Sequence, residues 1–125
     1  MRVLIIDDSA LMRRIVGKAL REARLELEEI VEAGNGAEGI AAMEQSGELF
    51  DLILCDVHMP GLDGVGFLRE LAARGLTTAR VVMVTSDACD PLVELALAAG
   101  ASGFIAKPFS VEQIRNLVLD LAGTA

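Results

Sequence analysis

The stretch Asp51-Leu52-Ile53-Leu54-Cys55-Asp56-Val57-His58-Met59-Pro60-Gly61 decides the fold. Its residues 52–55 are apolar without alternation, which is typical of a central parallel strand covered on both faces. Asp56 follows where such a strand ends, and the Pro60-Gly61 pair then forces a loop. A lone aspartate here could simply cap a turn. A strand end is also a rigid place for a reactive carboxylate, so the interpretation depends on what lies near Asp56.

The same alternation of apolar runs and helical periodicity extends along the whole chain. It predicts strands at residues 2–6, 27–33, 52–55, 80–85 and 102–106, and helices at residues 10–24, 37–45, 65–74, 91–99 and 111–121. Ser9 is expected to cap the first helix, Gly75 to end the third, and a capping box at residues 110–113 to open the fifth. Five strand–helix units in succession indicate an α/β fold, a doubly wound five-stranded parallel sheet with helices on both faces. The many carboxylates of residues 27–33 suit an edge strand, where charge discourages pairing between sheets.

Length and composition narrow the class of protein. The chain has 125 residues, 53% of them apolar, with a mean hydropathy of +0.48 and a net charge of −8. These values predict one domain over residues 1–125 with a real core, and they argue against nucleic-acid binding. No apolar run is long enough for a membrane span or a leader peptide, so we expect a cytoplasmic protein. Cys55 and Cys89 have no metal-binding spacing and are expected to be free thiols.

The helix at residues 10–24 has two contrasting sides. Its apolar stripe is expected to face the sheet. The stripe consists of Leu11, Ile15 and Ala19, with Met12 and Leu20 beside it. The other side carries Arg13, Arg14, Lys18, Arg21 and Arg24, nearly half of the basic residues of an acidic chain. This side is either an ordinary solvated face or a docking face for an acidic partner.

Reactive side chains follow the predicted strands at the end where parallel sheets bind ligands. They are Asp7, Asp8, Asp56, Thr85, Ser86 and Lys107. Neighbouring carboxylates call for a cation, and hard oxygen ligands favour Mg²⁺, with Mn²⁺ as an alternative. A carboxylate can also act as a nucleophile toward phosphorus, and a hydroxyl and an ammonium suit the oxygens of a phosphoryl group.

These residues closely resemble the receiver domain of bacterial two-component response regulators, especially the single-domain chemotaxis type. The matching motifs are Asp7-Asp8-Ser9, Asp56 with Met59-Pro60-Gly61-Leu62-Asp63-Gly64, Thr85-Ser86, and Phe104 before Lys107-Pro108. The resemblance covers essentially the whole chain. It implies the flavodoxin-like receiver fold with strand order 2-1-3-4-5.

The resemblance also implies the roles of the site residues. Asp56 would be the phosphoacceptor, and a phosphohistidine of a sensor histidine kinase or histidine phosphotransfer protein would be the donor. Asp8, Asp56 and the carbonyl of His58 would hold Mg²⁺, with Asp7 acting through water. Thr85 and Lys107 would bind the phosphoryl oxygens, and the Lys107-Pro108 peptide would be cis. Such a protein is a switch that assists its own phosphorylation and dephosphorylation rather than an enzyme.

Several flanking positions keep two interpretations. The His58 ring is expected beside the phosphoryl group, although it is also a potential metal ligand. Ser86 and Asp87 lie on the other flank. Asp87 either orients the attacking water or is a plain loop residue. Phe104 replaces the tyrosine of many relatives and is either a core aromatic or a switch that moves inward with Thr85.

The helix at residues 91–99 is apolar nearly all round, with Glu94 its only charge. We expect Leu92, Leu95, Ala96 and Ala99 to face the sheet. Val93, Leu97, Phe104 and Leu117 would then form a partner or homodimer surface on the fourth helix, fifth strand and fifth helix. Scattered surface apolar residues are the plainer interpretation.

Two other functions fit this sequence less well than a receiver does, and a third interpretation shares all of its signals. A phosphatase of the haloacid-dehalogenase type needs two aspartates two positions apart, whereas Asp7 and Asp8 are adjacent. A flavodoxin-like electron carrier needs a phosphate loop and aromatics, and this chain has no Trp or Tyr. A receiver cut from a larger regulator has the same sequence signals as a single-domain one.

Overall fold

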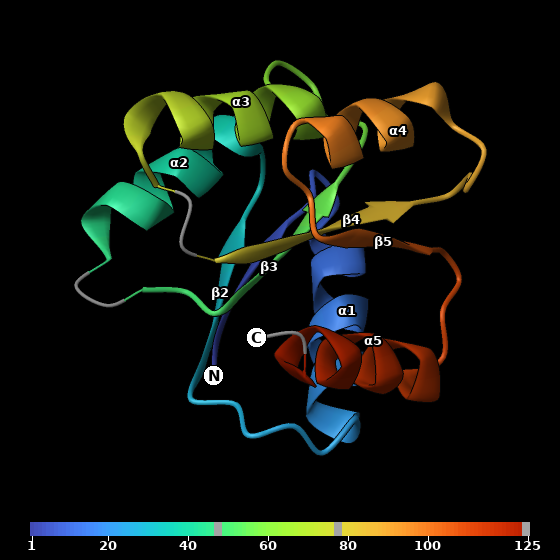
Figure 1. Ribbon diagram of the computed structural model, residues 1–125. Helices are drawn as coiled ribbons and strands as arrows, with labels where there is room; N and C mark the ends of the chain where they lie inside the picture. The colour runs from blue at the N-terminus through green and yellow to red at the C-terminus, as the bar shows by residue number, and fades with distance from the viewer. Residues whose placement is uncertain (47–48, 77–78, 124–125) are drawn as a thin grey trace.

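The computed structural model describes residues 1–46, 49–76 and 79–123. Figure 1 shows its alternating elements. The strands are β1 (Arg2–Ile6), β2 (Glu29–Ala33), β3 (Leu52–Asp56), β4 (Arg80–Thr85) and β5 (Gly103–Ala106), and the helices are α1 (Ala10–Glu22), α2 (Gly36–Gln45), α3 (Gly64–Arg74), α4 (Pro91–Ala98) and α5 (Val111–Gly123). Every predicted element is present, with ends shifted by two residues at most. None of these helices has the length and apolar content needed to cross a membrane in the described ranges.

The five strands form one parallel sheet in the order β2-β1-β3-β4-β5, which confirms the expected fold. Strand β1 lies between β2 and β3, so the strand order reverses beside β1 and β3. All carboxyl ends lie at the same edge of the sheet, because the strands are parallel. Strand β2 is at an edge, where its Glu29 and Glu32 side chains are exposed, as its charge predicts.

Helices cover both faces of the sheet (Figure 1). Helices α2, α3 and α4 lie on one face, and α1 and α5 lie on the other. Neighbouring strand residues point to opposite faces, so Leu4 joins the core under α2–α4 while Ile5 joins the core under α1 and α5. The central strands β1, β3 and β4 are buried on both sides, which is why their sequences are apolar without alternation.

The predicted helix-end signals are confirmed. The Ser9 hydroxyl accepts a hydrogen bond from the Met12 N–H at the start of α1. Ser110 and Gln113 form a capping box, in which each side chain accepts from the other's backbone N–H. Gly75 ends α3 with a φ of 70°, a left-handed conformation that glycine adopts without strain.

The predicted inner face of α1 is confirmed at Ala19 and Leu20 but wrong at Leu11 and Ile15. Val16, Gly17 and Leu20 are buried, whereas Leu11 and Ile15 are exposed. The periodicity was right, but the helix is rotated so that Gly17 lies against the sheet close to Ile5. A sequence pattern with apolar residues on both sides does not define which side packs on the sheet.

Glycine substitutions test this packing. A Cβ at Gly64 would lie 2.7 Å from the carbonyl oxygen of Asp56 and 2.5 Å from Met83 Cε. We therefore expect Gly64→Ala to lower the free energy of unfolding by about 2 kcal/mol through overpacking. A Cβ at Gly17 would meet nothing closer than 3.5 Å, so Gly17→Ala is expected to gain about 1 kcal/mol of helix propensity. Urea unfolding of both variants measures the difference, and equal midpoints for the two would contradict it.

Candidate functional site

Three aspartate side chains meet at the carboxyl edge of the sheet. Asp7 and Asp8 follow β1, and Asp56 is the last residue of the adjacent strand β3. One carboxylate oxygen from each residue lies within 4.8 Å of those of the other two. Asp7 is buried, Asp56 is half-buried and Asp8 is exposed, so the cluster lies at the surface with one side inside the protein. Its carboxylates repel one another unless a positive charge is near.

Lys107, which follows the edge strand β5, supplies that positive charge. Its Nζ lies 3.3 Å from Asp7 Oδ2 and 3.4 Å from Asp56 Oδ2. The Lys107 side chain is only 18% exposed, so its long stem is covered while its ammonium reaches the carboxylates. The Lys107–Pro108 peptide bond is cis, as expected. One lysine thus bridges two of the three carboxylates.

The charge of Asp56 is disfavoured despite this pairing. Burial raises the pKa of Asp56 above its ordinary value, and the nearby Asp7 carboxylate acts in the same direction. Lys107 opposes both effects but does not cancel them. Burial likewise raises the pKa of the Cys55 thiol, which stays neutral in the core as expected. A further cation near Asp56 would therefore stabilise its charged form.

The Thr85 hydroxyl is held by its own loop. Thr85 is buried at the end of β4, where its Oγ1 donates to the Asp87 carbonyl oxygen at 2.9 Å and accepts from the Asp87 N–H at 3.1 Å. The Asp87 side chain accepts from the Cys89 N–H, and Ser86 is exposed. Thr85 must give up a hydrogen bond to Asp87 before its hydroxyl can donate to anything bound at Asp56.

His58 has a partner that the sequence did not reveal. Its backbone N–H lies 3.4 Å from Asp56 Oδ1, and its ring Nε2 contacts Asp90 Oδ2. Asp90 therefore binds the ring that was expected to flank the phosphoryl group. The hydrogen bond to Asp90 raises the pKa of His58, and the same contact lowers the pKa of Asp90. The Asp-Pro pair at residues 90–91 signals a helix cap, but not a contact with His58.

The predicted partner surface needs one correction. Val93 is only 2% exposed and packs in the core with Ala96, whereas Leu95, expected to be inside, is 47% exposed. Helix α4 is rotated relative to the expected orientation. Because the helix is apolar nearly all round, its sequence did not indicate which side packs on the sheet. Leu97 and Phe104 are each 39% exposed, and Leu117 is partly buried. Phe104 thus points outward in this structure.

The basic residues of α1 divide into two groups. Arg13 turns toward the site, where its side chain donates to the Asp7 carbonyl oxygen and pairs with Glu32. Arg14, Lys18 and Arg21 are exposed, as predicted. The exposed side chains of Leu11 and Ile15 come from the same helix. This helix therefore presents apolar and basic side chains together.

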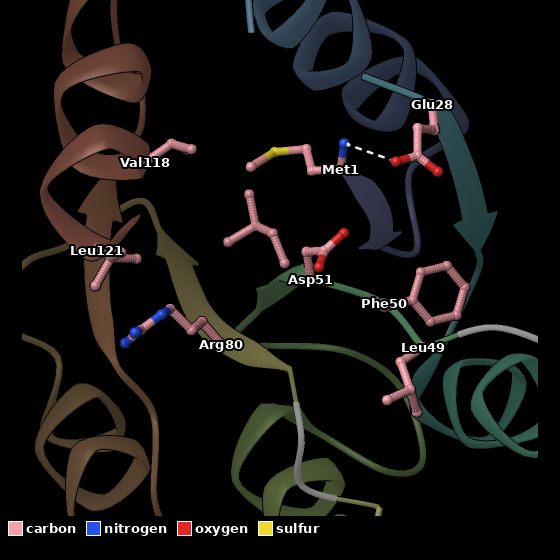
Figure 2. Close-up of a pocket in the computed structure, with 9 residues that line it drawn as sticks. Met1, Glu28, Leu49, Phe50, Asp51, Arg80, Val118 and Leu121 are labelled. Carbon is pink, nitrogen blue, oxygen red and sulfur yellow. Dashed lines mark ion pairs between the residues drawn. The ribbon is translucent and has the colours of Figure 1, made fainter. Parts of the chain in front are cut away.

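A cavity lies at the opposite edge of the sheet. It has a volume of about 550 Å³ and opens at the amino ends of β1, β3 and β4 (Figure 2). Figure 2 shows Val118 and Leu121 of α5 on one side and Leu49 and Phe50 on the other. At the carboxyl edge, Asp8 is exposed and Asp56 is half-buried, so the carboxylate cluster can be reached by a group carried by another molecule.

Comparison with known proteins agrees with this geometry. A family model described as the response regulator receiver domain matches residues 3–119. The transcriptional regulatory protein PdtaR of Mycobacterium tuberculosis is 37% identical over 113 residues, which are 90% of this chain and 52% of PdtaR. The chain thus spans about half the length of that relative.

Two chemotaxis proteins are similar over nearly their whole length. The probable chemotaxis protein CheY of Rhizobium etli is 32% identical over 118 residues, or 94% of this chain and 88% of the relative. The solved structure of chemotaxis protein CheY4 from Vibrio cholerae has a TM-score of 0.82 at 28% identity, covering 95% of this chain and 96% of that one.

The raised pKa of Asp56 predicts how stability depends on pH. The folded state holds the Asp56 proton more tightly than the unfolded state, so stability is lost as the pH rises from the ordinary carboxyl pKa through the raised folded value. Without divalent cations, Asp56→Asn should therefore match wild type near about pH 3.5 and be more stable than wild type near about pH 7. Urea unfolding across this range measures the difference. Asp51→Asn, at the other end of β3, is the control, and a pH-independent difference at Asp56 would contradict the assignment.

Proposed function

The chain belongs to the response regulator receiver family, and we propose that it is a phosphorylation-dependent signalling switch whose acceptor is Asp56. The observation that carries the proposal is the meeting of the Asp56 carboxylate, two further aspartates and Lys107 at one open edge of the sheet. The donor would be a phosphohistidine of a sensor histidine kinase or of a histidine phosphotransfer protein in a phosphorelay.

The proposed transfer makes an acyl phosphate on Asp56. A carboxylate oxygen of Asp56 bonds to phosphorus while the phosphorus–nitrogen bond of the donor breaks, and the electron pair stays on the imidazole nitrogen, which takes up a proton. Water later attacks phosphorus, releases inorganic phosphate and restores the carboxylate. The chain would assist its own phosphorylation and its own dephosphorylation. It would not be an enzyme, because the phosphoryl group is transferred to the chain itself and not to a separate substrate.

The carboxylate cluster fits a divalent metal ion. Magnesium takes six oxygen ligands at about 2.1 Å, so ligand oxygens around one ion lie roughly 3 to 4.2 Å apart. The three carboxylate oxygens lie within 4.8 Å of one another, which is compatible with that arrangement. Asp8, Asp56 and the His58 carbonyl would hold Mg²⁺, or Mn²⁺, with Asp7 acting through water. The ion would neutralise charge on the transferring phosphoryl group.

Lys107 and Thr85 would bind the phosphoryl oxygens once they arrive. Lys107 is already between Asp7 and Asp56, so it needs only a small movement to donate to an oxygen on Asp56. Thr85 would exchange its bond to the Asp87 carbonyl for a bond to the phosphoryl group. That exchange would alter the β4–α4 loop and make room for Phe104 to move inward.

The output surface would lie on α4, β5 and α5. With Val93 in the core, Leu97, Phe104 and Leu117 remain from the predicted set, and Leu95 joins them as an exposed apolar side chain. This surface would bind a downstream protein or a second copy of the chain. The net charge of −8 gives no support to nucleic-acid binding by this domain, and a cytoplasmic location follows from the proposed partners.

The chain as described could act alone or as the receiver part of a longer regulator. Similarity to CheY proteins over nearly their full length favours the single-domain form. The length of PdtaR, about twice the matched region, favours a receiver that is part of a longer regulator. Residues 1–125 act as one phosphoacceptor domain in both cases. The adjacent position of Asp7 and Asp8 still speaks against an aspartate-dependent phosphatase.

Intact-mass analysis tests the acceptor. With a small phosphodonor such as acetyl phosphate and Mg²⁺, wild type is expected to gain the mass of one phosphoryl group, and a chelator should abolish the gain. Asp56→Asn should gain nothing, because an amide is not a nucleophile toward phosphorus. Asp51→Asn makes the same change at the other end of β3 and should label like wild type. Labelling of Asp56→Asn, or equal labelling in chelator, would overturn the proposal.

The exposed basic side of α1 is expected to help dock the phosphodonor. Replacing Arg14, Lys18 and Arg21 together by Ser should slow transfer from the cognate kinase at least about threefold at low salt, through a lower association rate. Most of the difference should disappear at about 0.5 M salt, where exposed charges are screened. Arg69→Ser on α3 removes an exposed charge elsewhere and should match wild type. Equal transfer rates at low salt would leave α1 as an ordinary solvated face.

A further inference from the structure

One side-chain pair connects the two loops beside Asp56. His58 lies on the β3–α3 loop, two residues after Asp56, and Asp90 lies at the start of α4. His58 Nε2 contacts Asp90 Oδ2. The His58 side chain is 64% exposed, whereas that of Asp90 is 15% exposed. The pair therefore joins a free-standing imidazole to a carboxylate that is packed into the helix start.

Asp90 is the N-cap of α4 and is also bonded to the Thr85 loop. Its Oδ1 accepts from the Leu92 N–H at 2.9 Å. Its own N–H donates to the Asp87 carbonyl oxygen at 3.1 Å, the same oxygen that accepts from Thr85 Oγ1. One residue thus connects the imidazole of His58, the first turn of α4 and the loop that holds the Thr85 hydroxyl.

Besides these contacts, packing of Val93 and Leu92 against the core holds this end of helix α4. The helix has eight residues, and only Val93 and Ala96 are buried. Short helices with few buried side chains open locally at low free-energy cost. The two side-chain contacts of Asp90 are thus a substantial part of what fixes the first turn.

His58 is placed to meet a group on Asp56. Its backbone nitrogen already lies 3.4 Å from Asp56 Oδ1, and its side chain is 64% exposed, which leaves the ring room to rotate. A phosphoryl group carries a charge of about −2 and three strong acceptor oxygens. The Nε2–H group of His58 can donate to one of these oxygens only if it leaves the Asp90 carboxylate oxygen that it now contacts.

We propose that the His58–Asp90 pair holds the first turn of α4 in the unphosphorylated protein, and that a phosphoryl group on Asp56 takes His58 away from Asp90. Release of Asp90 would loosen the start of α4 next to the output surface. The first half concerns the resting protein alone, and the second half rests on the proposed phosphorylation of Asp56.

Amide hydrogen exchange at Leu92 and Val93 in the full chain tests the first half. His58→Ala removes the imidazole and leaves Asp90 as the cap. Asp90→Ser keeps a good N-cap residue but is too short to reach His58. Both variants should exchange these amides roughly fivefold faster than wild type, the expected effect of losing one hydrogen bond. The double variant should be no faster than Asp90→Ser, because both changes remove the same contact.

Two controls separate the pair from general loss of stability. His58→Gln keeps a side-chain N–H that can donate to Asp90 and should exchange near the wild-type rate. Glu94→Gln removes a negative charge from the same turn of α4 without touching the pair and should also stay near wild type. Wild-type exchange in both His58→Ala and Asp90→Ser, or additive effects in the double variant, would overturn the role of the pair.

Beryllofluoride with Mg²⁺, a stable mimic of the phosphoryl group, tests the second half. It should speed exchange at Leu92 and Val93 by a clearly larger factor in wild type than in His58→Ala, where only the Thr85 bond exchange acts on the loop. Equal acceleration in both proteins would overturn the exchange of partners while leaving the resting contact intact. Failure of beryllofluoride to bind wild type would overturn the second half together with the proposed phosphorylation, and the variants without the mimic would still decide the first half.

Discussion

The contact of the Lys107 ammonium with Asp7 and Asp56 is the constraint on which the site depends. Its Nζ lies 3.3 Å and 3.4 Å from the two carboxylates, in a place where burial disfavours the charge of Asp56. The sheet order makes the contact available, because β1 and β3 are adjacent and β5 lies beyond β4 at the same edge. Breaking a partly buried ion pair leaves uncompensated charge, which costs more than the pair itself contributes. The five strands therefore create a cluster of three carboxylates whose negative charge Lys107 offsets only in part.

Such a site responds to what it binds. A metal ion adds positive charge, and a phosphoryl group adds negative charge, so each favours the arrival of the other. The side chains around the cluster are already engaged: Thr85 with Asp87, and His58 with Asp90. A new ligand on Asp56 must compete for them, which is how a local change of charge can reach α4. The open surface of the cluster suits a donor carried by another protein.

Much of this could be predicted from the sequence. Unbroken apolar runs identified buried parallel strands, and capping residues such as Ser9 and Ser110 located helix starts. The reactive residues were found because parallel strands bring their carboxyl ends together. What failed was helix rotation: Ile15 is outside and Val93 is inside because α1 and α4 carry apolar residues on more than one side. The contact between His58 and Asp90 joins two loops, and no sequence periodicity encodes it.

The most direct test of this charge balance is a Mg²⁺ titration of thermal stability in wild type and in Lys107→Ala. Ligand binding to the folded state raises the unfolding temperature, and tighter binding raises it further at the same ligand concentration. The account predicts that Mg²⁺ stabilises wild type and stabilises Lys107→Ala more strongly, because the same carboxylates then lack their resident cation. Asp8→Asn should weaken the response in both backgrounds. An equal Mg²⁺ response with and without Lys107, or none in wild type, would contradict the account.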